Sequence, residues 1–207
     1  MRPYLRVKRL TDVLFAATLL VALSPLLLIL ALAIRIALGP PVIYRQTRVG
    51  KGGRLFALLK FRTMRDEYDG NGTPKPDELR LTRLGRSLRA ASLDELPQLV
   101  NVMRGDMALV GPRPLLPEYL ARYSPRQARR HEVRPGITGL SQVRGRNALR
   151  WSKRLALDVW YVDHLSARVD AYIMWRTLVS LVRRDGIAAP GHATMPPFLG
   201  RPEARPS

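Results

Sequence analysis

Residues 13–34 form an uncharged, largely apolar run of 22 residues near the start of the chain. A straight helix of that length is about 33 Å long at about 1.5 Å per residue, which matches the hydrocarbon core of a bilayer. Basic residues precede the run and Ala31-Leu32-Ala33 resembles a cleavage site, so a secretory signal is an alternative. The run exceeds the roughly 7–15 apolar residues of such signals, and the sequence therefore predicts a helix that stays in the membrane.

Ser24-Pro25 interrupts this run near its middle. Proline lacks the N–H that a helix needs, and its ring collides with the carbonyl four residues earlier, so the helix must bend there. A spanning helix usually has more basic residues on its cytoplasmic side, but here they flank the run on both sides, at Arg6, Lys8, Arg9, Arg35, Arg45 and Arg48. A re-entrant helix with both ends on the cytoplasmic face explains this symmetry, and an ordinary kinked span is the equal alternative.

The chain carries 35 Lys and Arg against 16 Asp and Glu, a formal net charge of +19. Such an excess indicates an anionic partner: nucleic acid, acidic lipid headgroups or a phosphorylated substrate. Arginine outnumbers lysine, which suits phosphate contacts, although a GC-rich genome gives the same bias. Cysteine is absent, which excludes disulfides, thiolate zinc sites and a cysteine nucleophile, and favours a chain whose bulk lies on the cytoplasmic side.

The rest of the chain predicts short elements. Residues 42–61 predict a β-hairpin around a Gly-rich turn that lacks the spacing of a phosphate-binding P-loop. Apolar periodicity predicts helices at residues 81–89, 96–104, 151–165 and 169–184, with a polar loop at 66–78 and a stiff extended loop at 110–117. The fold class is therefore mainly α with a small β-hairpin. It divides into a membrane helix (1–38), a cytoplasmic domain with membrane-surface helices (39–184) and a flexible tail (185–207).

Asp94 and Glu95 are adjacent carboxylates ahead of an apolar segment. Ser92 and Glu95 have the spacing of a helix capping box, which is the structural explanation of the pair. Pro97 argues against the box, because a helix that starts after Ser92 would drive the proline ring into a carbonyl. A start near Asp94 or Glu95 puts Pro97 in the first turn and Asp94 at the positive end of the helix dipole. An ionised Asp94 could then attack phosphorus, while Glu95 binds Mg²⁺ through a hard oxygen.

Four motifs occur in order: KFRTM at residues 60–64, SLDELPQ at 92–98, GDMALVGPRP at 105–114, and RPGITG at 134–139 followed by RGRN at 144–147. With the apolar run and its Ser24-Pro25, they strongly resemble the bacterial sugar transferases, which are small monotopic phosphoglycosyl transferases. The resemblance covers about residues 6–184, nearly the whole chain. Each motif alone is a weak match, but four in order are highly specific.

The resemblance implies transfer of a sugar-1-phosphate from a UDP-sugar to polyprenyl (undecaprenyl) phosphate in the bacterial inner membrane, with release of UMP. It implies that Asp94 carries the phosphosugar in a covalent intermediate and that Glu95 is associated with Mg²⁺. It makes residues 39–184 a catalytic domain on the cytoplasmic face and favours the re-entrant helix bent at Ser24 and Pro25. The product would be the first lipid-linked sugar of a surface polysaccharide or glycoprotein glycan.

The resemblance also assigns Lys60, Arg89 and Arg113 to basic positions that line the active site. Arg113 lies between two prolines that fix its backbone, although a solvated loop arginine is the plain explanation. Lys60 and Arg62 are expected on one face of a strand, so that one contacts substrate and the other lipid headgroups. Arg89 could instead complement a helix end. Three lesser substrate-binding candidates complete the set: Gln142, Arg146 and Asp158.

Two alternatives come from other classes of protein. A membrane-anchored, basic nucleic-acid-binding protein explains the charge, but no stacking aromatic set or known reading motif accompanies it, so no nucleic-acid partner is expected. A catalytically inactive scaffold of a glycan assembly complex is the second alternative, and the intact Asp94-Glu95 pair argues against it. A homodimer and downstream glycosyltransferases are compatible partners. The sequence specifies neither them nor the donor sugar.

Overall fold

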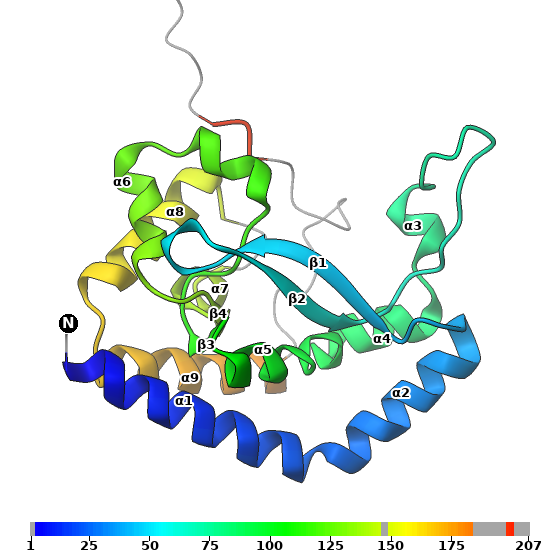
Figure 1. Cartoon of the computed structure of the whole chain (residues 1–207), viewed down its shortest axis with the longest axis horizontal. Helices are drawn as coiled ribbons and strands as arrows, with labels where there is room; N and C mark the ends of the chain where they lie inside the picture. The colour runs from blue at the N-terminus through cyan, green and yellow to red at the C-terminus, as the bar shows by residue number, and fades with distance from the viewer. Residues whose placement is uncertain (1–2, 146–148, 184–197, 201–207) are drawn as a thin grey trace, which may run out of the picture.

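The computed structural model describes residues 3–145, 149–183 and 198–200, which are mainly helical with two small two-stranded sheets (Figure 1). A mainly α fold with a small β-hairpin is therefore confirmed. The helices are α1 (Pro3–Ala22), α2 (Ser24–Leu38), α3 (Asp77–Arg80), α4 (Arg83–Ala90), α5 (Gln98–Arg104), α6 (Pro125–Ala128), α7 (Leu140–Val143), α8 (Trp151–Asp163) and α9 (Ala167–Arg183). The 3₁₀ turns are η1 (Lys51–Gly53), η2 (Leu93–Glu95), η3 (Pro117–Arg122) and η4 (Arg129–Glu132), and the strands are β1 (Ile43–Val49), β2 (Leu55–Phe61), β3 (Ala108–Val110) and β4 (Gly136–Thr138).

α1 and α2 meet at a 64° bend and form an open V along one edge of the molecule (Figure 1). Pro25 has no N–H to donate to the Val21 carbonyl, and the Ser24 hydroxyl donates to that carbonyl instead, at 2.8 Å. The serine thus satisfies the acceptor that the proline leaves open, which matters most in an apolar environment. None of the described helices is by itself long and apolar enough to cross a bilayer, whereas the two arms of the V meet that criterion when counted together.

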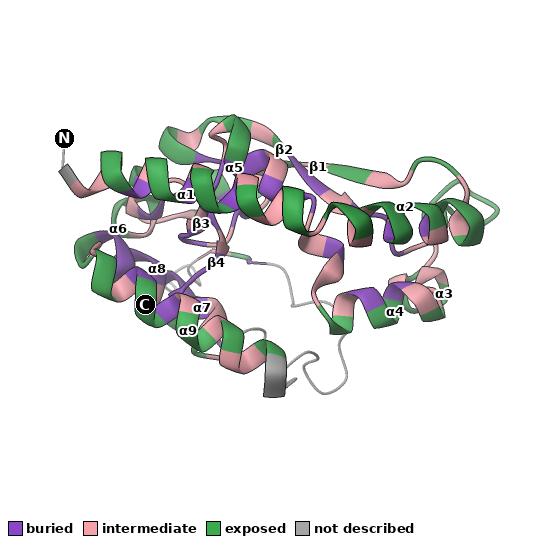
Figure 2. Ribbon diagram, turned by 90° about the horizontal axis from the view of Figure 1, so that it is seen from below, coloured by how far each residue is buried: buried purple, intermediate pink, exposed green. Residues whose placement is uncertain are grey.

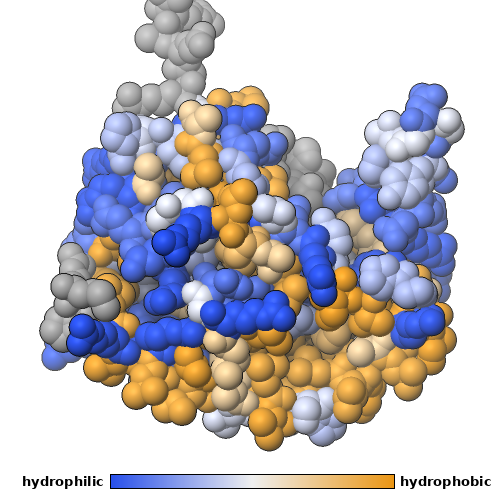
Figure 3. All heavy atoms as spheres, in the orientation of Figure 1, coloured by the Kyte–Doolittle hydropathy of each residue, from blue (hydrophilic) through white to orange (hydrophobic). Residues whose placement is uncertain are grey.

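The outer side of this V is apolar, and Figure 3 shows hydrophobic side chains gathered along the edge that α1 and α2 form. Val21, Leu28 and Ile36 are 75%, 71% and 77% exposed. The inner side packs on the protein, where Ala16 and Ile34 are fully buried. An exposed apolar face of this extent is typical of a surface that contacts lipid or protein.

β1 and β2 pair antiparallel from Ile43 opposite Phe61 to Val49 opposite Leu55, which confirms the predicted hairpin. Gly52 and Gly53 in the turn have φ values of 64° and 78°, a conformation that glycine adopts without strain. Leu58 and Phe61 of β2 are buried against α1, α2 and α5. β2 is therefore the strand that faces the body of the protein.

The segment that carries the two carboxylates differs from the prediction. α4 and α5 confirm helices near residues 81–89 and 96–104, but α5 begins only at Gln98, directly after Pro97. Ser92 has a left-handed φ of 56° and makes no capping hydrogen bond, so Asp94 and Glu95 lie in the 3₁₀ turn η2. The predicted helix start near Asp94 or Glu95 is wrong, because the tight turn after Ser92 precedes the helix. Asp94 and Glu95 therefore precede the first turn of α5, and the charges of neighbouring side chains, rather than the helix dipole, set their protonation states.

A second sheet, not predicted from the sequence, pairs β3 and β4 in parallel. The two strands approach so closely that a Cβ on Gly136 would lie 2.1 Å from the Gly111 nitrogen. This pairing anchors the extended segment at residues 111–116, in agreement with the predicted stiff loop. α8 and α9 confirm the last two predicted helices; Tyr161 of α8 and Ile173 of α9 are buried in one core cluster with Val110 of β3, and Figure 2 shows buried residues on the inner side of α8.

Phe198, within the predicted tail, packs on the domain at residues 39–184. Phe198 is 4% exposed and lies in an aromatic cluster with Tyr119, Tyr123 and Trp151. Arg122 donates a hydrogen bond to the Phe198 carbonyl. This part of the tail is therefore a component of the folded domain.

Candidate active site

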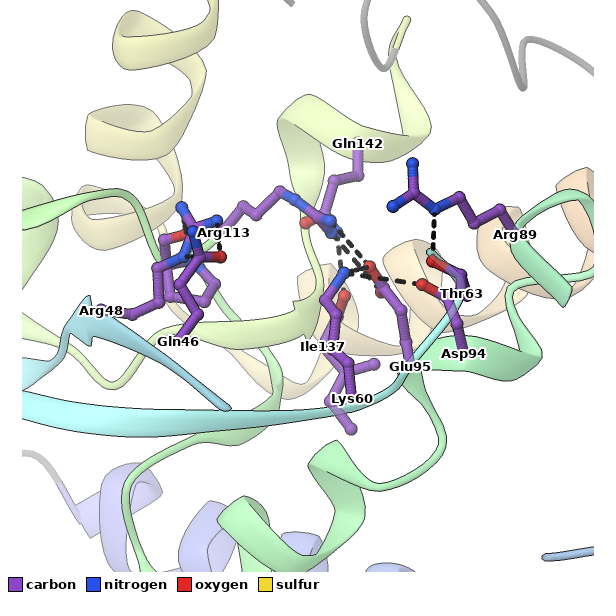
Figure 4. Close-up of polar contacts among 11 residues, drawn as sticks. Gln46, Arg48, Lys60, Thr63, Arg89, Asp94, Glu95, Arg113, Ile137 and Gln142 are labelled. Atoms are coloured by element: carbon purple, nitrogen blue, oxygen red, sulfur yellow. Dashed lines mark hydrogen bonds and ion pairs between the residues drawn. The ribbon is translucent and has the colours of Figure 1, made fainter. Parts of the chain in front are cut away.

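Three separate segments bring a cluster of charged side chains around η2 (Figure 4). Glu95 projects from η2, Lys60 from β2, and Arg113 from the extended segment after β3. Lys60 Nζ and Arg113 Nη2 both donate to Glu95 Oε1 at 2.7 Å. Pro112 and Pro114 restrict the backbone on either side of Arg113, so the guanidinium is held over the carboxylate. The structure thus brings together Lys60, Glu95 and Arg113 from distant parts of the sequence.

The two carboxylates of η2 have opposite electrostatic environments. Burial would raise the pKa of Glu95, but the charges of Arg113 and Lys60 outweigh it and hold that pKa well below its usual range. Glu95 in turn raises the pKa of Arg113. Burial raises the pKa of Asp94, and Lys60 opposes this only in part because its Nζ lies 3.8 Å from Asp94 Oδ2. Glu95 is therefore a fixed anion, whereas Asp94 is the more basic carboxylate.

Asp94 is only 7% exposed, yet its carboxylate accepts no hydrogen bond from the described residues. Lys60 Nζ forms an ion pair with Asp94 Oδ2 at 3.8 Å, which is too long for a hydrogen bond. An oxygen that is not engaged in hydrogen bonds keeps its lone pairs for a substrate. Asp94 therefore has the properties that a nucleophile or a metal ligand requires.

Arg89 approaches this cluster from α4. Its Nε donates to Thr63 Oγ1 at 3.0 Å, and Thr63 follows directly after β2. Arg89 makes no ion pair within the described ranges, although its charge acts on Asp94 and lowers the pKa of that carboxyl. In Figure 4 its guanidinium lies on the Asp94 side of the cluster, opposite Arg48. Arg89 therefore places at one end of the site a cation that pairs with no carboxylate of the described residues.

The structure does not bring Arg62 to the carboxylates. β2 ends at Phe61, and the Arg62 guanidinium instead donates to the carbonyls of Leu38, Gly39 and Pro40 at the end of α2. It also pairs with Asp66 at 3.1 Å. The expectation that Lys60 and Arg62 share one strand face is wrong because the strand stops between them. Arg62 therefore satisfies backbone carbonyls at and just after the C-terminal end of α2.

The lesser candidates occupy different places. Gln142 lies beside Arg113 in Figure 4; its Nε2 donates to the Ile137 carbonyl at 2.8 Å, and its Oε1 is buried without a partner among the described residues. Asp158 is 1% exposed and lies in a buried ion pair with Arg130, outside the cluster around η2. Arg146 lies outside the described residues.

Sequence reasoning missed Thr63, Arg48 and Arg130 as neighbours of the site. Thr63 lies within the KFRTM motif, and its position beside Lys60 was an available signal. In the sequence, Arg48 stands out only as one of the basic residues that flank the apolar run. Arg130 Nη2 donates to the Arg113 carbonyl at 2.7 Å, a contact over 17 positions that no local pattern indicates.

The comparisons with known proteins agree on one family. The model of the bacterial sugar transferase family matches residues 3–184. An uncharacterized sugar transferase, EpsL, of Bacillus subtilis (strain 168) is 49% identical over 93% of this chain and 96% of its own length. A UDP-glucose:undecaprenyl-phosphate glucose-1-phosphate transferase of Caulobacter vibrioides is 46% identical over 86% of this chain and 70% of its own length. The exopolysaccharide production protein ExoY of Sinorhizobium fredii is 38% identical over 86% and 87% of the two chains. The chain therefore belongs to the bacterial sugar transferase family.

Proposed function

We propose that this transferase moves a sugar-1-phosphate from a UDP-sugar to undecaprenyl phosphate or a similar polyprenyl phosphate, and releases UMP. The observation that carries the proposal is the pairing of a buried Asp94 that accepts no hydrogen bond from the described residues with a Glu95 already neutralised by two cations. The name of the Caulobacter relative supports the same pair of substrates. The reaction would be the first membrane step of surface polysaccharide or glycoconjugate synthesis, in line with the name of the Sinorhizobium relative.

In the first step, an Asp94 carboxylate oxygen attacks the phosphorus that bears the sugar, and the bond from that phosphorus to the bridging oxygen breaks. UMP leaves with the electron pair of that bond. In the second step, an oxygen of the lipid phosphate attacks the same phosphorus and releases Asp94. Lys60 and Arg113 stabilise the charge on the phosphoryl oxygens, because preorganised cations in a buried site need little rearrangement. Arg89 supplies a further cation at the Asp94 end.

Mg²⁺ is the proposed cofactor. The described residues contain no group of three metal-binding side chains. Mg²⁺ commonly uses one or two carboxylates together with substrate phosphates and water, and the adjacent Asp94 and Glu95 supply that number. The ion would neutralise the diphosphate of the donor. This site requires that Glu95 coordinate the ion while it also accepts hydrogen bonds from Lys60 and Arg113.

The proposed location is the bacterial inner membrane, with the V of α1 and α2 re-entrant and the catalytic domain on the cytoplasmic face. The 64° bend, the exposed apolar outer side and the basic residues at both ends of the V support this topology. Tyr172 and Trp175 of α9 are 41% and 65% exposed, which suits a helix at the membrane surface. A homodimer and contacts with downstream glycosyltransferases stay predictions.

The test is turnover by the full chain in nanodiscs with Mg²⁺, undecaprenyl phosphate and a panel of UDP-sugars. The expected result is UMP together with a lipid-linked sugar phosphate from at least one donor, and loss of both products after chelation of the metal. Salt-sensitive oligonucleotide binding without turnover of any donor would instead support the basic binding protein. Turnover of none of the donors, with no nucleic-acid binding, would favour the scaffold.

A further inference from the structure

Arg48 lies at the opposite end of the charged cluster from Arg89 (Figure 4). Its side chain, from β1, is half-buried and donates from Nε and Nη2 to Gln46 Oε1 at 3.2 and 2.6 Å. Its Nη1 makes only a long contact of 3.4 Å with the Pro114 carbonyl. The Gln46 side-chain amide and the Pro114 carbonyl thus fix the planar guanidinium. Both groups are neutral, so neither offsets its positive charge.

Arg48 and Arg89, at the two ends of the cluster, both lack an ion pair among the described residues, whereas the cations between them are paired. Lys60 and Arg113 each form an ion pair with Glu95, and Arg130 forms one with Asp158, but Arg48 has no ion pair in the described part of the chain. The charged or titratable groups that act on it are Arg113, Tyr44, Tyr119 and Glu95. Burial, together with the charge of Arg113, lowers the pKa of Arg48 to about 10. A cation held under these conditions would gain stability from a bound anion.

A small cavity of ≈ 20 Å³ separates Arg48 from Lys60 and Arg113. Leu58, Gln98 and Pro114 complete its lining. A space of this size admits about one small polar group, such as a phosphate oxygen, within reach of three cations. The cavity adjoins the carboxylates, because two of its lining residues, Lys60 and Arg113, donate hydrogen bonds to Glu95.

Arg48 is also the cation of the cluster that lies away from Asp94. In Figure 4, Asp94 and Arg89 lie on one side of the cluster and Arg48 on the other, with Glu95 and Lys60 between them. A phosphate that reaches Arg48 is therefore not the one that Asp94 attacks. In a diphosphate, the neighbouring phosphate is the one that leaves with the nucleotide.

We infer that Arg48 binds the nucleotide-side phosphate of the donor, with Gln46 as its positioning residue; this inference rests on the proposed function. When the Asp94–phosphorus bond forms, the bond from phosphorus to the bridging oxygen breaks. The electron pair stays on that oxygen, which becomes a terminal oxygen of UMP, so negative charge grows beside Arg48. Arg48 then stabilises the leaving group as well as the bound donor.

The first test measures the binding of UDP and UMP by calorimetry in nanodiscs. Arg48→Gln is expected to weaken UDP binding by about ten- to a hundred-fold, as for the loss of a charge-assisted hydrogen bond. Arg48→Lys should fall between it and the parent, since it keeps the charge but loses the fork. Gln46→Leu should weaken binding by several-fold. The matched control is Arg45→Gln, which removes the same charge from an exposed position on β1 and should change binding less than two-fold.

Thermal unfolding of each variant separates lost binding from lost folding, and Arg48→Lys carries the test where Arg48→Gln does not fold. The inference is overturned when a folded Arg48→Gln or Arg48→Lys binds UDP as tightly as Arg45→Gln. A second readout is the single-turnover rate of UMP release from the UDP-sugar, which should fall in Arg48→Gln and not in Arg45→Gln. Arg48-dependent UDP binding by a parent protein that turns over no UDP-sugar would refute the proposed function and leave the phosphate contact standing.

Discussion

Two buried clusters of this protein pair carboxylates with arginine, and they differ in how fully their charges are satisfied. Asp158 Oδ2 accepts from Arg130 Nε and Nη2 at 3.1 and 2.8 Å, and its Oδ1 accepts from Ser141 at 2.9 Å. Around η2, Glu95 is satisfied in the same manner, but Asp94 accepts no hydrogen bond from the described residues. The first cluster is closed, and the second keeps one carboxylate for a ligand.

The Asp158–Arg130 cluster also supports the cluster around η2. Arg130 uses Nη2 both for Asp158 and for the Arg113 carbonyl, at 2.8 and 2.7 Å. The buried pair thus holds the backbone from which Arg113 reaches Glu95. Asp158 is thus a carboxylate that maintains structure, whereas Asp94 is one that is available to a ligand.

The largest effect is expected from Asp94→Asn. Loss of the nucleophile should reduce turnover by about 10⁴-fold or more, because no other group replaces the bond that it forms. The thermal midpoint should be unchanged or higher, since a desolvated carboxylate becomes a neutral amide. Turnover is measured as UMP release in nanodiscs, and a variant that keeps more than a tenth of the parent rate would contradict the assignment.

Asp158→Leu, by contrast, should act mainly on the stability of the fold. It leaves Arg130, which is 3% exposed, without its carboxylate and should lower the free energy of unfolding by about 3–5 kcal/mol. The double variant Asp158→Leu, Arg130→Met removes both charges and should recover much of that loss. Denaturant or thermal unfolding measures both, and equal stability of the parent and Asp158→Leu would show that the pair is not structural.

A third, smaller effect concerns the pH dependence of turnover. Asp94 must be ionised to attack, so kcat/KM should fall as pH drops through its pKa, which burial raises above the usual aspartate value. Lys60→Met removes a charge that lowers this pKa and should move the acid limb to higher pH. Profiles of kcat/KM against pH for the two proteins provide the measurement. An acid limb that stays in place or moves to lower pH would argue that a group other than Asp94 titrates.

The smallest effect is a loss of stability in acid that depends on His131 in η4, next to Arg130 of the Arg130–Asp158 cluster. Burial and the charge of Arg130 lower the pKa of His131 to about 4, against about 6.5 in the unfolded chain. The unfolded state therefore binds more protons between these values, and stability should fall by about 2 kcal/mol from pH 7 to pH 5. His131→Asn should flatten this part of the thermal profile. A slope that is unchanged in the variant would assign the acid sensitivity to other groups.

The sequence predicted what depends on local pattern. The alternation and glycines of residues 42–61 indicated the hairpin, and Ser24-Pro25 indicated the bend. The order of short motifs pointed to Lys60, Glu95 and Arg113, which the structure brings together. These features need no knowledge of which distant segments meet.

What escaped prediction depends on tertiary contacts or on a single backbone torsion. The left-handed Ser92 converts an expected helix start into η2, and the end of β2 at Phe61 sends Arg62 to the carbonyls of α2. The parallel pair of β3 and β4 involves only three residues on each strand, too few for a periodic signal. The sequence offers Asp158 as a substrate-binding candidate. Its buried pairing with Arg130, 28 positions away, leaves no signal in the local sequence and could not be predicted.

The most direct test of the account is the intact mass of the protein after incubation with Mg²⁺ and each UDP-sugar, without lipid acceptor. The account predicts a gain of one sugar phosphate with a stoichiometric release of UMP, and no gain in Asp94→Asn. The size of the gain would identify the class of donor sugar. An unchanged mass, with UMP released only after polyprenyl phosphate is added, would contradict the covalent role of Asp94 and indicate direct transfer.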